Sequence, residues 1–245
     1  MSTQVNVNAI EPEGGTTTLT VGQTGQNTVI SADAVKVNTF KDSGGNTLFT
    51  SNGSGVLSSV NSGFGSAQVL ISSQTADGDT SLSFTSGIDS TYDEYIFEFY
   101  SIHPATDGVE IQFNASTDGG SNYNVTKTGT FYRAAHPESG AYYDFGYSSG
   151  TYKTPAQATT YQALNYDVDN DADSCCVGEL HIFNPSSTTY VKNYYSVSQT
   201  MLNATTSQQA FVGGYLNTTS AVNAIDFKMA SGNMDTGTIK LWGIK

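Results

Sequence analysis

The chain contains almost no arginine and few charged residues of either sign. Only Arg133 carries a guanidinium group, and Asp, Glu, Lys and Arg together make up 13% of the 245 residues. Acidic residues outnumber basic ones by 22 to 9, which gives a formal charge of −13 at pH 7. Such a chain repels a phosphate backbone, so the sequence argues against nucleic acid as a partner.

Long apolar runs are missing too. No stretch approaches the roughly 18 consecutive apolar residues of a membrane span. The start, MSTQVNVNAIEPEGG, lacks the basic and apolar regions of a signal peptide. We therefore expect a protein made in the cytoplasm without membrane insertion. The two cysteines, Cys175 and Cys176, are adjacent, where a mutual disulfide would be strained, so we expect free thiols.

No part of the sequence carries a helical stripe of apolar residues, whereas strand patterns are common. The clearest lies between Tyr92 and Tyr123, where apolar and polar residues alternate from Tyr95 to Phe99 and again from Val109 to Ala115. Strict alternation marks a half-buried strand, and the intervening HPATDG supplies turn formers. We expect these two strands to form an antiparallel unit whose apolar face a second sheet covers.

Similar candidate strands recur along the rest of the chain, separated by loops rich in Gly, Asn, Asp, Ser and Thr. They span residues 68–72, 81–85, 95–102, 109–115, 125–133, 161–166, 177–183, 190–197, 211–216, 224–229 and 238–244. Short strands of even spacing without helices predict an all-β fold. We expect an antiparallel β-sandwich, most simply a jelly roll, over residues 67–245.

Residues 1–66 follow a different pattern. Apolar pairs such as Leu19 with Val21 and Leu48 with Phe49 are short and separated by glycines. Strands of this kind bury too little apolar surface for a core of their own, so we expect an extended β arm that associates with other copies. A flexible, partly disordered arm is the alternative. SVNSGFGSA, residues 59–67, looks like the linker to the head.

One short motif resembles the Asp-box of sialidase propellers, which shapes a hairpin turn. Ser116, Asp118, Gly120 and Tyr123 fit its S-x-D-x-G-x-x-aromatic pattern. Sialidases hold a substrate carboxylate with several arginines, and a chain with one arginine cannot build that clamp. The pattern therefore favours a turn over a sugar-acid site.

The sequence offers no catalytic residue set. The three histidines are scattered, and there is no HExxH, no GxSxG and no cluster of cysteine and histidine. Two carboxylates at the separation that glycosidases need stay open, because spacing in sequence does not reveal distance in space. We expect no enzyme activity and assign no catalytic residue.

Four aspartates alternate along the segment DVDNDAD and are candidate ligands for Ca²⁺. They are Asp167, Asp169, Asp171 and Asp173. The EF-hand pattern fails, because Ala172 stands where that loop needs glycine and Gly178 where it needs glutamate. A calcium site of another class and a solvated acidic turn both remain open.

The best candidate for a binding surface is the tyrosine-rich segment from Tyr142 to Tyr161. It holds Tyr142, Tyr143, Phe145, Tyr147 and Tyr152 among Gly and Ser, with no apolar run of strand length. Tyrosine supplies a large rigid ring and a hydroxyl at low entropic cost, as in adaptable recognition loops. The alternative is that these rings cover a sheet or a seam between subunits.

Four phrases of the sequence are distinctive. They are NTFKDSGGNTLFTSNGSG, SFTSGIDSTYDEYIFEFYSIHPATDGVEIQFNASTDGGSNYN, GELHIFNPSSTTYVK and GYLNTTSAVNAIDFKMASGNMDTGTIKLWGIK. From about Val37 onward, the chain resembles a family of virion appendage proteins from tailed phages of marine bacteria. The resemblance implies a slender N-terminal β segment fixed to the particle and a β-sandwich knob, most often in a homotrimer. It supplies no catalytic residues.

Three hypotheses of different classes follow. The first is a non-enzymatic virion protein, assembled in the host cytoplasm, whose arm binds the major capsid protein or a tail adaptor. The second is a carbohydrate-binding module, alone or in a tail-fibre receptor-binding protein, whose tyrosine-rich loop stacks on host surface glycans. The third is a polysaccharide-degrading enzyme. We expect the first, as a capsid decoration or head fibre, because 245 residues are short for a tail fibre that reaches the host.

Overall fold

The computed structural model describes residues 38–54, 57–58, 60, 67–202 and 205–244. Throughout these ranges the regular elements are β-strands, which confirms the all-β prediction. None of the described segments forms a helix with the length and apolarity that crossing a bilayer requires. The chain divides into two compact units, Met1–Phe64 and Gly65–Lys245.

The first unit contains a small antiparallel sheet with the strand order β1-β2-β3. Its strands are β1 (Thr39–Lys41), β2 (Thr47–Ser51) and β3 (Leu57–Ser58). The turn between β1 and β2 is held by Asp42, whose Oδ1 accepts hydrogen bonds from the backbone N–H groups of Gly44 and Asn46. The apolar pairs expected before residue 38, including Leu19 with Val21, lie outside the described residues.

No side chain described in the first unit is buried within a single chain. The Phe40 and Phe49 rings stack with centroids 5.2 Å apart, yet Phe40 remains 46% exposed. Leu57 is 51% exposed. Because these side chains are the apolar residues that would have to form a core, the described part of this unit has no core of its own.

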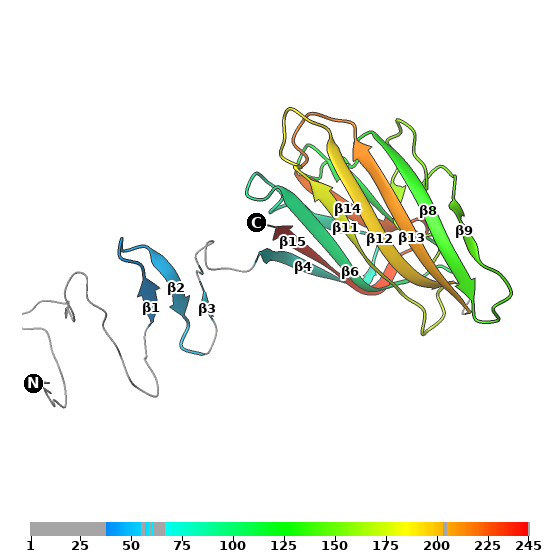
Figure 1. Ribbon diagram of the computed structural model, residues 1–245, viewed down its shortest axis with the longest axis horizontal. Helices are drawn as coiled ribbons and strands as arrows, with labels where there is room; N and C mark the ends of the chain where they lie inside the picture. The colour runs from blue at the N-terminus through cyan, green and yellow to red at the C-terminus, as the bar shows by residue number, and fades with distance from the viewer. Residues whose placement is uncertain (1–37, 55–56, 59, 61–66, 203–204, 245) are drawn as a thin grey trace, which may run out of the picture. The chain divides into compact units, whose positions relative to one another are not determined.

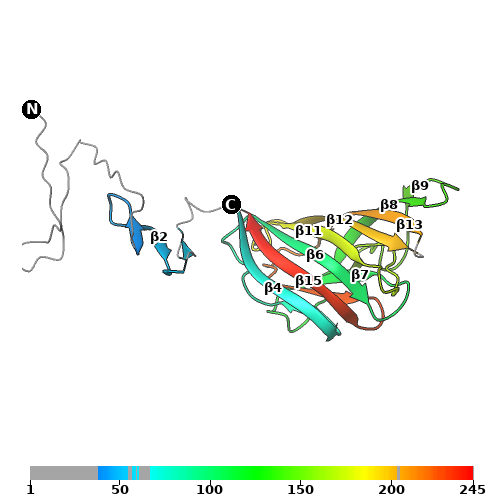
Figure 2. The same cartoon turned by 90° about the horizontal axis from the view of Figure 1, so that it is seen from below.

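The second unit consists of two antiparallel sheets, called here the large sheet and the small sheet (Figures 1 and 2). The large sheet has the order β4 (Gln68–Asp79), β15 (Met234–Ile244), β6 (Glu94–Pro104), β11 (Cys176–Phe183), β12 (Lys192–Leu202), β13 (Thr206–Leu216), β8 (Lys127–Pro137) and β9 (Asp144–Tyr147). The small sheet has the order β10 (Gln162–Ala163), β7 (Ile111–Ser116), β14 (Ala224–Met229) and β5 (Leu82–Phe84). The two sheets pack as a β-sandwich.

Aromatic rings from both sheets fill the space between them. Tyr95, Phe97 and Phe99 alternate along β6, and each is at most 1% exposed. The Phe97 ring lies 5.3 Å from that of Phe84 and 5.2 Å from that of Phe227, both on the small sheet. Burying one such side chain stabilises the fold by roughly 2 to 3 kcal/mol. The inward face predicted for β6 is therefore confirmed.

The expectation that β6 and β7 pair in one antiparallel unit is wrong. Strand β6 lies between β15 and β11 in the large sheet, whereas β7 lies between β10 and β14 in the small sheet. The HPATDG connection carries the chain from one layer to the other. Two strands that each bury one apolar face can cover each other by facing across the sandwich, which here replaces pairing side by side.

The turn after β7 is built from the Asp-box residues, as predicted. Ser116 Oγ accepts a hydrogen bond from the Gly120 N–H at 3.0 Å, and Asp118 Oδ1 accepts one from the Asn122 N–H at 2.9 Å. Gly120 has a φ of 91°, a conformation that favours glycine. The hydrogen bond from the Asn122 side chain lowers the pKa of Asp118 to about 2. Beyond the turn, the chain crosses to β8 in the large sheet.

The outer face of the small sheet is covered by polar side chains that hydrogen-bond one another. Lys127 Nζ donates to Asn114 Oδ1 at 2.6 Å and to the Thr160 carbonyl at 2.7 Å. Asp226 accepts hydrogen bonds from Ser83 Oγ at 2.5 Å and from the Tyr161 hydroxyl at 2.9 Å. Burial lowers the pKa of Lys127 to about 7. Both faces of this sheet are therefore shielded from solvent.

Candidate functional site

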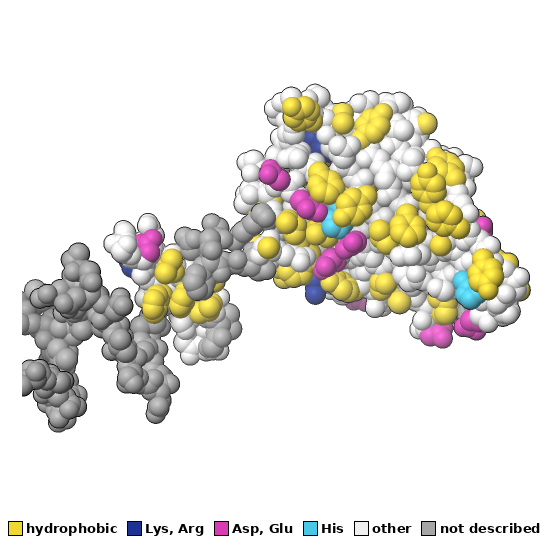
Figure 3. Space-filling view, viewed as in Figure 1, with side chains coloured by type: hydrophobic (Ala, Val, Ile, Leu, Met, Phe, Trp, Pro, Cys, Tyr) yellow, Lys and Arg dark blue, Asp and Glu magenta, His cyan; other side chains and the backbone are white. Residues whose placement is uncertain are grey.

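The outer face of the large sheet differs from that of the small sheet because it carries exposed rings. Alternation along each strand sends one set of side chains into the core and the other outward. On β12 the buried positions are Lys192, Tyr194, Ser196, Ser198 and Thr200, which leaves Tyr195, Val197 and Gln199 on the outer face. Figure 3 looks onto this face, where apolar side chains gather in several clusters.

One row of outward residues crosses four neighbouring strands. Val197 on β12 pairs with Phe211 on β13, Phe211 pairs with Tyr132 on β8, and Tyr132 pairs with Tyr147 on β9. Phe211, Tyr132 and Tyr147 are 38%, 43% and 54% exposed. The Tyr132 and Tyr147 rings meet edge to face with centroids 5.4 Å apart. Cross-strand pairing therefore holds a line of partly exposed rings in fixed positions.

The next row of outward residues holds two amides, one alanine and one ring. Gln199 pairs with Gln209, Gln209 pairs with Ala134, and Ala134 pairs with Phe145, which is 75% exposed. Gln199 Nε2 donates a hydrogen bond to Ser207 Oγ at 3.0 Å. We call the outward residues of β12, β13, β8 and β9 the aromatic face. Its members central to the argument are Tyr132, Phe145, Tyr147, Tyr195, Val197, Gln199, Gln209 and Phe211.

The aromatic face contains no charged side chain, although the chain as a whole has a formal charge of −13. Acidic groups lie only at its borders. Asp144 at one border is paired with Arg133 Nη2 at 2.6 Å. At the opposite border burial raises the pKa of Tyr195, and the nearby Glu94 and Glu179 reinforce the shift. Tyr195 therefore stays protonated at neutral pH and keeps its hydroxyl as a donor.

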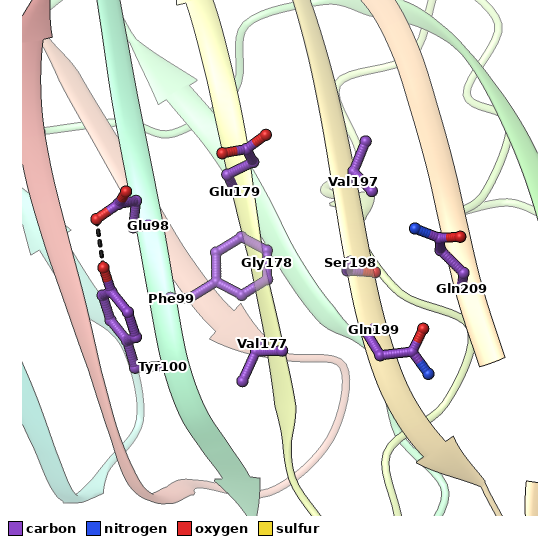
Figure 4. Close-up of a pocket in the computed structure, with 10 residues that line it drawn as sticks. All are labelled: Glu98, Phe99, Tyr100, Val177, Gly178, Glu179, Val197, Ser198, Gln199 and Gln209. Carbon is purple, nitrogen blue, oxygen red and sulfur yellow. Dashed lines mark hydrogen bonds between the residues drawn. The ribbon is translucent and has the colours of Figure 1, made fainter. Parts of the chain in front are cut away.

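Three shallow hollows adjoin one another on this side of the large sheet. Their volumes are about 300, 470 and 420 Å³. Gln199 lines all three, Gln209 lines two, and Ser207 lines two. The first hollow is shown in Figure 4, where Gln199 and Gln209 lie on one side and Glu98 with Tyr100 on the other. The two glutamines thus occupy the centre of the hollowed area.

The floor of the first hollow depends on a glycine in β11. A Cβ atom at Gly178 would lie 2.4 Å from the Val197 carbonyl oxygen and 2.7 Å from the Phe99 ring. Any larger residue would push β11 away from β12 or displace the buried ring. Across the hollow, Glu98 accepts hydrogen bonds from the Tyr100 hydroxyl and from Trp242 Nε1, the latter at 2.7 Å. The bond to Glu98 raises the pKa of Tyr100 to about 12.

The structure brings together three of the five aromatic residues that the sequence singled out. Phe145 and Tyr147 belong to β9 on the aromatic face, and Tyr143 stacks on His136 of β8 with centroids 4.9 Å apart. Tyr142 is 50% exposed. Tyr152 lies elsewhere, because its carbonyl accepts a hydrogen bond from the Ala163 N–H on β10 of the small sheet. A loop without strands was also expected here, whereas β9 is a short strand.

Sequence reasoning missed the partners of these rings on β12, β13 and β8. Tyr132, Tyr195 and Phe211 each occupy an outward position in a strand that the sequence did predict. Alternation alone marks them as outward. What it does not give is the register that places Phe211 beside Tyr132, since these residues are far apart in the chain and pair across β13 and β8.

The four candidate calcium ligands do not form a cluster of carboxylates. Asp169 is buried, whereas Asp171 and Asp173 are exposed. Burial raises the pKa of Asp167 to about 6, and Lys153 nearby partly opposes that shift. Within the described ranges, no three His, Cys, Asp or Glu side chains come together in a way that would hold a metal ion. Calcium binding at these aspartates stays a prediction.

The histidines and cysteines occupy separate places. His181 Nδ1 lies 2.6 Å from Glu94 Oε1, and its ring stacks on Tyr195 with centroids 4.3 Å apart. His103 Nδ1 lies 4.0 Å from Asp235 Oδ2. Cys175 and Cys176 are free thiols, as expected, and burial raises the pKa of Cys176. A buried thiol with a raised pKa is a poor nucleophile.

Comparison of the chain with protein-family models, with curated proteins and with solved structures found no match.

Proposed function

We propose that this protein is a non-enzymatic appendage of a phage particle, in which the first unit attaches and oligomerises and the second unit is a projecting head. The observation that carries the proposal is that no described side chain of the first unit is buried within one chain. Phe40 and Leu57 need a cover that the described part of their own unit does not supply. Other copies of the chain, or the surface of a particle, are natural covers.

The strand order of the second unit supports a head of the jelly-roll type. Leaving aside β8–β9 and β12–β13, the chain runs β4, β5, β6, β7, β10, β11, β14 and β15. These strands form two sets of four with the orders β4-β15-β6-β11 and β5-β14-β7-β10. We infer a jelly roll, an architecture common in capsid and lectin domains, into which two strand pairs have been inserted. Both inserted pairs extend the large sheet.

The proposal gives the arm a specific role. Three arms that wrap about one axis would cover the exposed faces of Phe40 and Leu57 and would leave three heads free. The arm would also bind the major capsid protein of the particle, which makes the head a capsid decoration. The resemblance of the sequence to phage appendage proteins supports a place on the particle.

Light scattering on the purified full-length protein tests the oligomeric part of the proposal. We expect a mass three times the chain mass of 25.9 kDa. The double substitution Phe40→Ser and Leu57→Ser should shift the protein toward monomer, because these changes remove the apolar surface that the copies share. Phe145→Ser, at a ring that is 75% exposed in the second unit, is the matched control and should leave the trimer intact. A monomeric wild-type protein would refute the trimer.

The location on the particle needs a separate experiment. Antibodies against residues 67–245 should label intact phage particles in electron micrographs, with the label distributed over the capsid. Label confined to the tail would favour a tail fibre instead. The appendage proposal would be refuted if the protein is detected in the unpurified phage preparation but the purified intact particles carry no label.

A further inference from the structure

The aromatic face exposes rings that proteins usually bury. Phe145, Tyr147, Tyr132 and Phe211 are all more than a third exposed, and they occupy neighbouring positions on β9, β8 and β13. Contiguous exposed apolar surface of this kind marks a site of interaction. Figure 3 shows apolar side chains gathered in several clusters on this side of the large sheet.

The charges on and around the aromatic face limit the kinds of partner that can bind there. An anionic partner, such as a nucleic acid or a sulfated polymer, needs several cationic groups, and the outward positions of these four strands contain no lysine or arginine and a single histidine, His136. The nearest charged groups on the borders of the hollows are mostly acidic, among them Glu138 and Glu179, and they would repel such a partner. The face is therefore suited to a neutral ligand.

The polar groups on the aromatic face further limit the kinds of ligand that can bind there. Gln199 and Gln209 lie side by side in the row next to the rings, and Gln199 lines all three hollows. A carboxamide both donates and accepts hydrogen bonds. Gln199 Nε2 already donates to the Thr200 carbonyl and to Ser207 Oγ, so an apolar protein surface over this pair would strand the Gln199 Oε1 acceptor and the Gln209 carboxamide, which is costly. A ligand with many hydroxyl groups satisfies them, while its C–H surfaces rest on the neighbouring rings.

The geometry points to a neutral carbohydrate chain bound across β12, β13, β8 and β9, with Phe211 and Tyr132 as stacking platforms and Gln199 and Gln209 as hydrogen-bonding groups. The row from Val197 to Tyr147 crosses three strand spacings, or roughly 14 Å. This length suits a short oligosaccharide segment. Because the platforms stand on paired strands, they are held in place before the ligand arrives.

This inference differs from the loop-based site that the sequence suggested. Tyr152 has no part in it, and the central residues come from β8, β12 and β13 instead of the segment around β9 alone. It rests on the proposed function only for where the face is displayed, namely on the head of a particle appendage. Its test uses purified protein, so its failure and the failure of the appendage proposal are separate outcomes.

The test is affinity electrophoresis of the full-length protein in gels that contain dextran, laminarin, mannan or agarose as neutral polymers and alginate or heparin as anionic ones. We expect retardation by at least one neutral polymer and by neither anionic polymer. Tyr132→Ala and Phe211→Ala should each weaken that binding about tenfold, the effect of losing one stacking contact. Gln209→Ala should weaken it less.

Tyr190→Ala is the matched control, because this ring is 73% exposed but precedes β12 and lies off the aromatic face. It should leave the binding unchanged. Near-ultraviolet circular dichroism establishes that each variant is folded. Retardation by no neutral polymer, or equal retardation of wild type and both ring variants, would overturn the inference. Retardation by anionic polymers alone would do the same. So would a trimer or dimer that Tyr132→Ala and Phe211→Ala dissociate, because a second copy would then occupy the face.

Discussion

The outer faces of the two sheets of the head differ in which side chains they cover and which they expose to solvent. On the small sheet the polar side chains of Asn114 and Asp226 are covered and hydrogen-bonded, with Lys127 of β8 donating to Asn114. The large sheet instead leaves Tyr132 and Phe211 exposed. A fold that minimised only its own free energy would do the reverse, with apolar groups covered and polar groups in water. The comparison indicates that the outer face of the large sheet serves a purpose other than stability.

The sharpest test of this difference compares two phenylalanines on opposite faces of the large sheet. Phe97 is fully buried and contacts Phe84 and Phe227, so Phe97→Ala should lower the free energy of unfolding by about 3 to 5 kcal/mol. Phe211→Ala should lower it by only about 1 kcal/mol, because the ring is 38% exposed and loses mainly its cross-strand contacts with Val197 and Tyr132. Urea denaturation measures both. A loss above about 2 kcal/mol for Phe211→Ala would assign that ring to the fold instead.

A second test addresses the covered face of the small sheet through pH. Burial holds the pKa of Lys127 at about 7, below the value near 10.4 of an unfolded lysine. Between these values the unfolded chain binds more protons than the folded one, so this group makes stability rise with pH. We expect a gain of about 2 kcal/mol between pH 7 and pH 9.5, measured by urea denaturation and largely absent in Lys127→Met.

Lys127→Met also leaves the Thr160 carbonyl without its Lys127 donor and removes one of the two hydrogen bonds that Asn114 Oδ1 accepts, the other coming from the Ala115 N–H. At pH 9.5 the variant should therefore be less stable than wild type by about 1 to 3 kcal/mol. Lys240→Met, at a half-buried position on β15, is a suitable control for the loss of one positive charge. If both variants flattened the pH profile equally, the effect would come from net charge and not from burial.

The smallest expected effect concerns Asp167, whose pKa burial raises to about 6. An acid with a raised pKa binds more protons when folded, so its contribution to stability falls as pH rises from about 4 to 6. Asp167→Asn should accordingly raise the free energy of unfolding at pH 7 by about 1 kcal/mol, a value discounted because the side chain is partly exposed. A thermal melt in buffer with EDTA measures the gain.

The same variant tests the calcium prediction with the opposite sign. If Asp167 and Asp169 ligate Ca²⁺, millimolar calcium should raise the melting temperature of wild type, and Asp167→Asn should then be the less stable protein. Asp173→Asn, at an exposed position of the same segment, is the matched control for charge. Melting temperatures that do not respond to calcium would leave burial as the explanation of the raised pKa.

Strand positions were predictable from the sequence because alternation is a local property. The strands around Phe97, Phe113 and Val197 were all expected close to where they lie. Pairing was not predictable in the same way. β6 and β7 are joined by a short turn, yet they lie in different sheets, because which neighbour a strand selects depends on the packing of distant segments.

The candidate site was predictable only at its edge. Tyr143, Phe145 and Tyr147 attract attention as a run of aromatic residues, whereas Phe211 and Tyr132 look like ordinary members of a strand. Their role follows from register across β13 and β8, which the sequence does not state. The buried Lys127 was likewise invisible, since a single lysine at the start of a strand is usually solvated.

The placement of β4 bears on how the head would withstand mechanical load. β4 is the first strand of the second unit, and its only partner in the large sheet is β15. Their pairing runs from Gln68 with Ile244 to Asp79 with Met234, with one shift of register between Leu241 and Trp242. Tension applied to the chain ahead of Gln68, along the strand direction, must break these bonds together, which makes rupture slow. Such a pair of strands would suit the proposed role, in which a bound ligand pulls on the head.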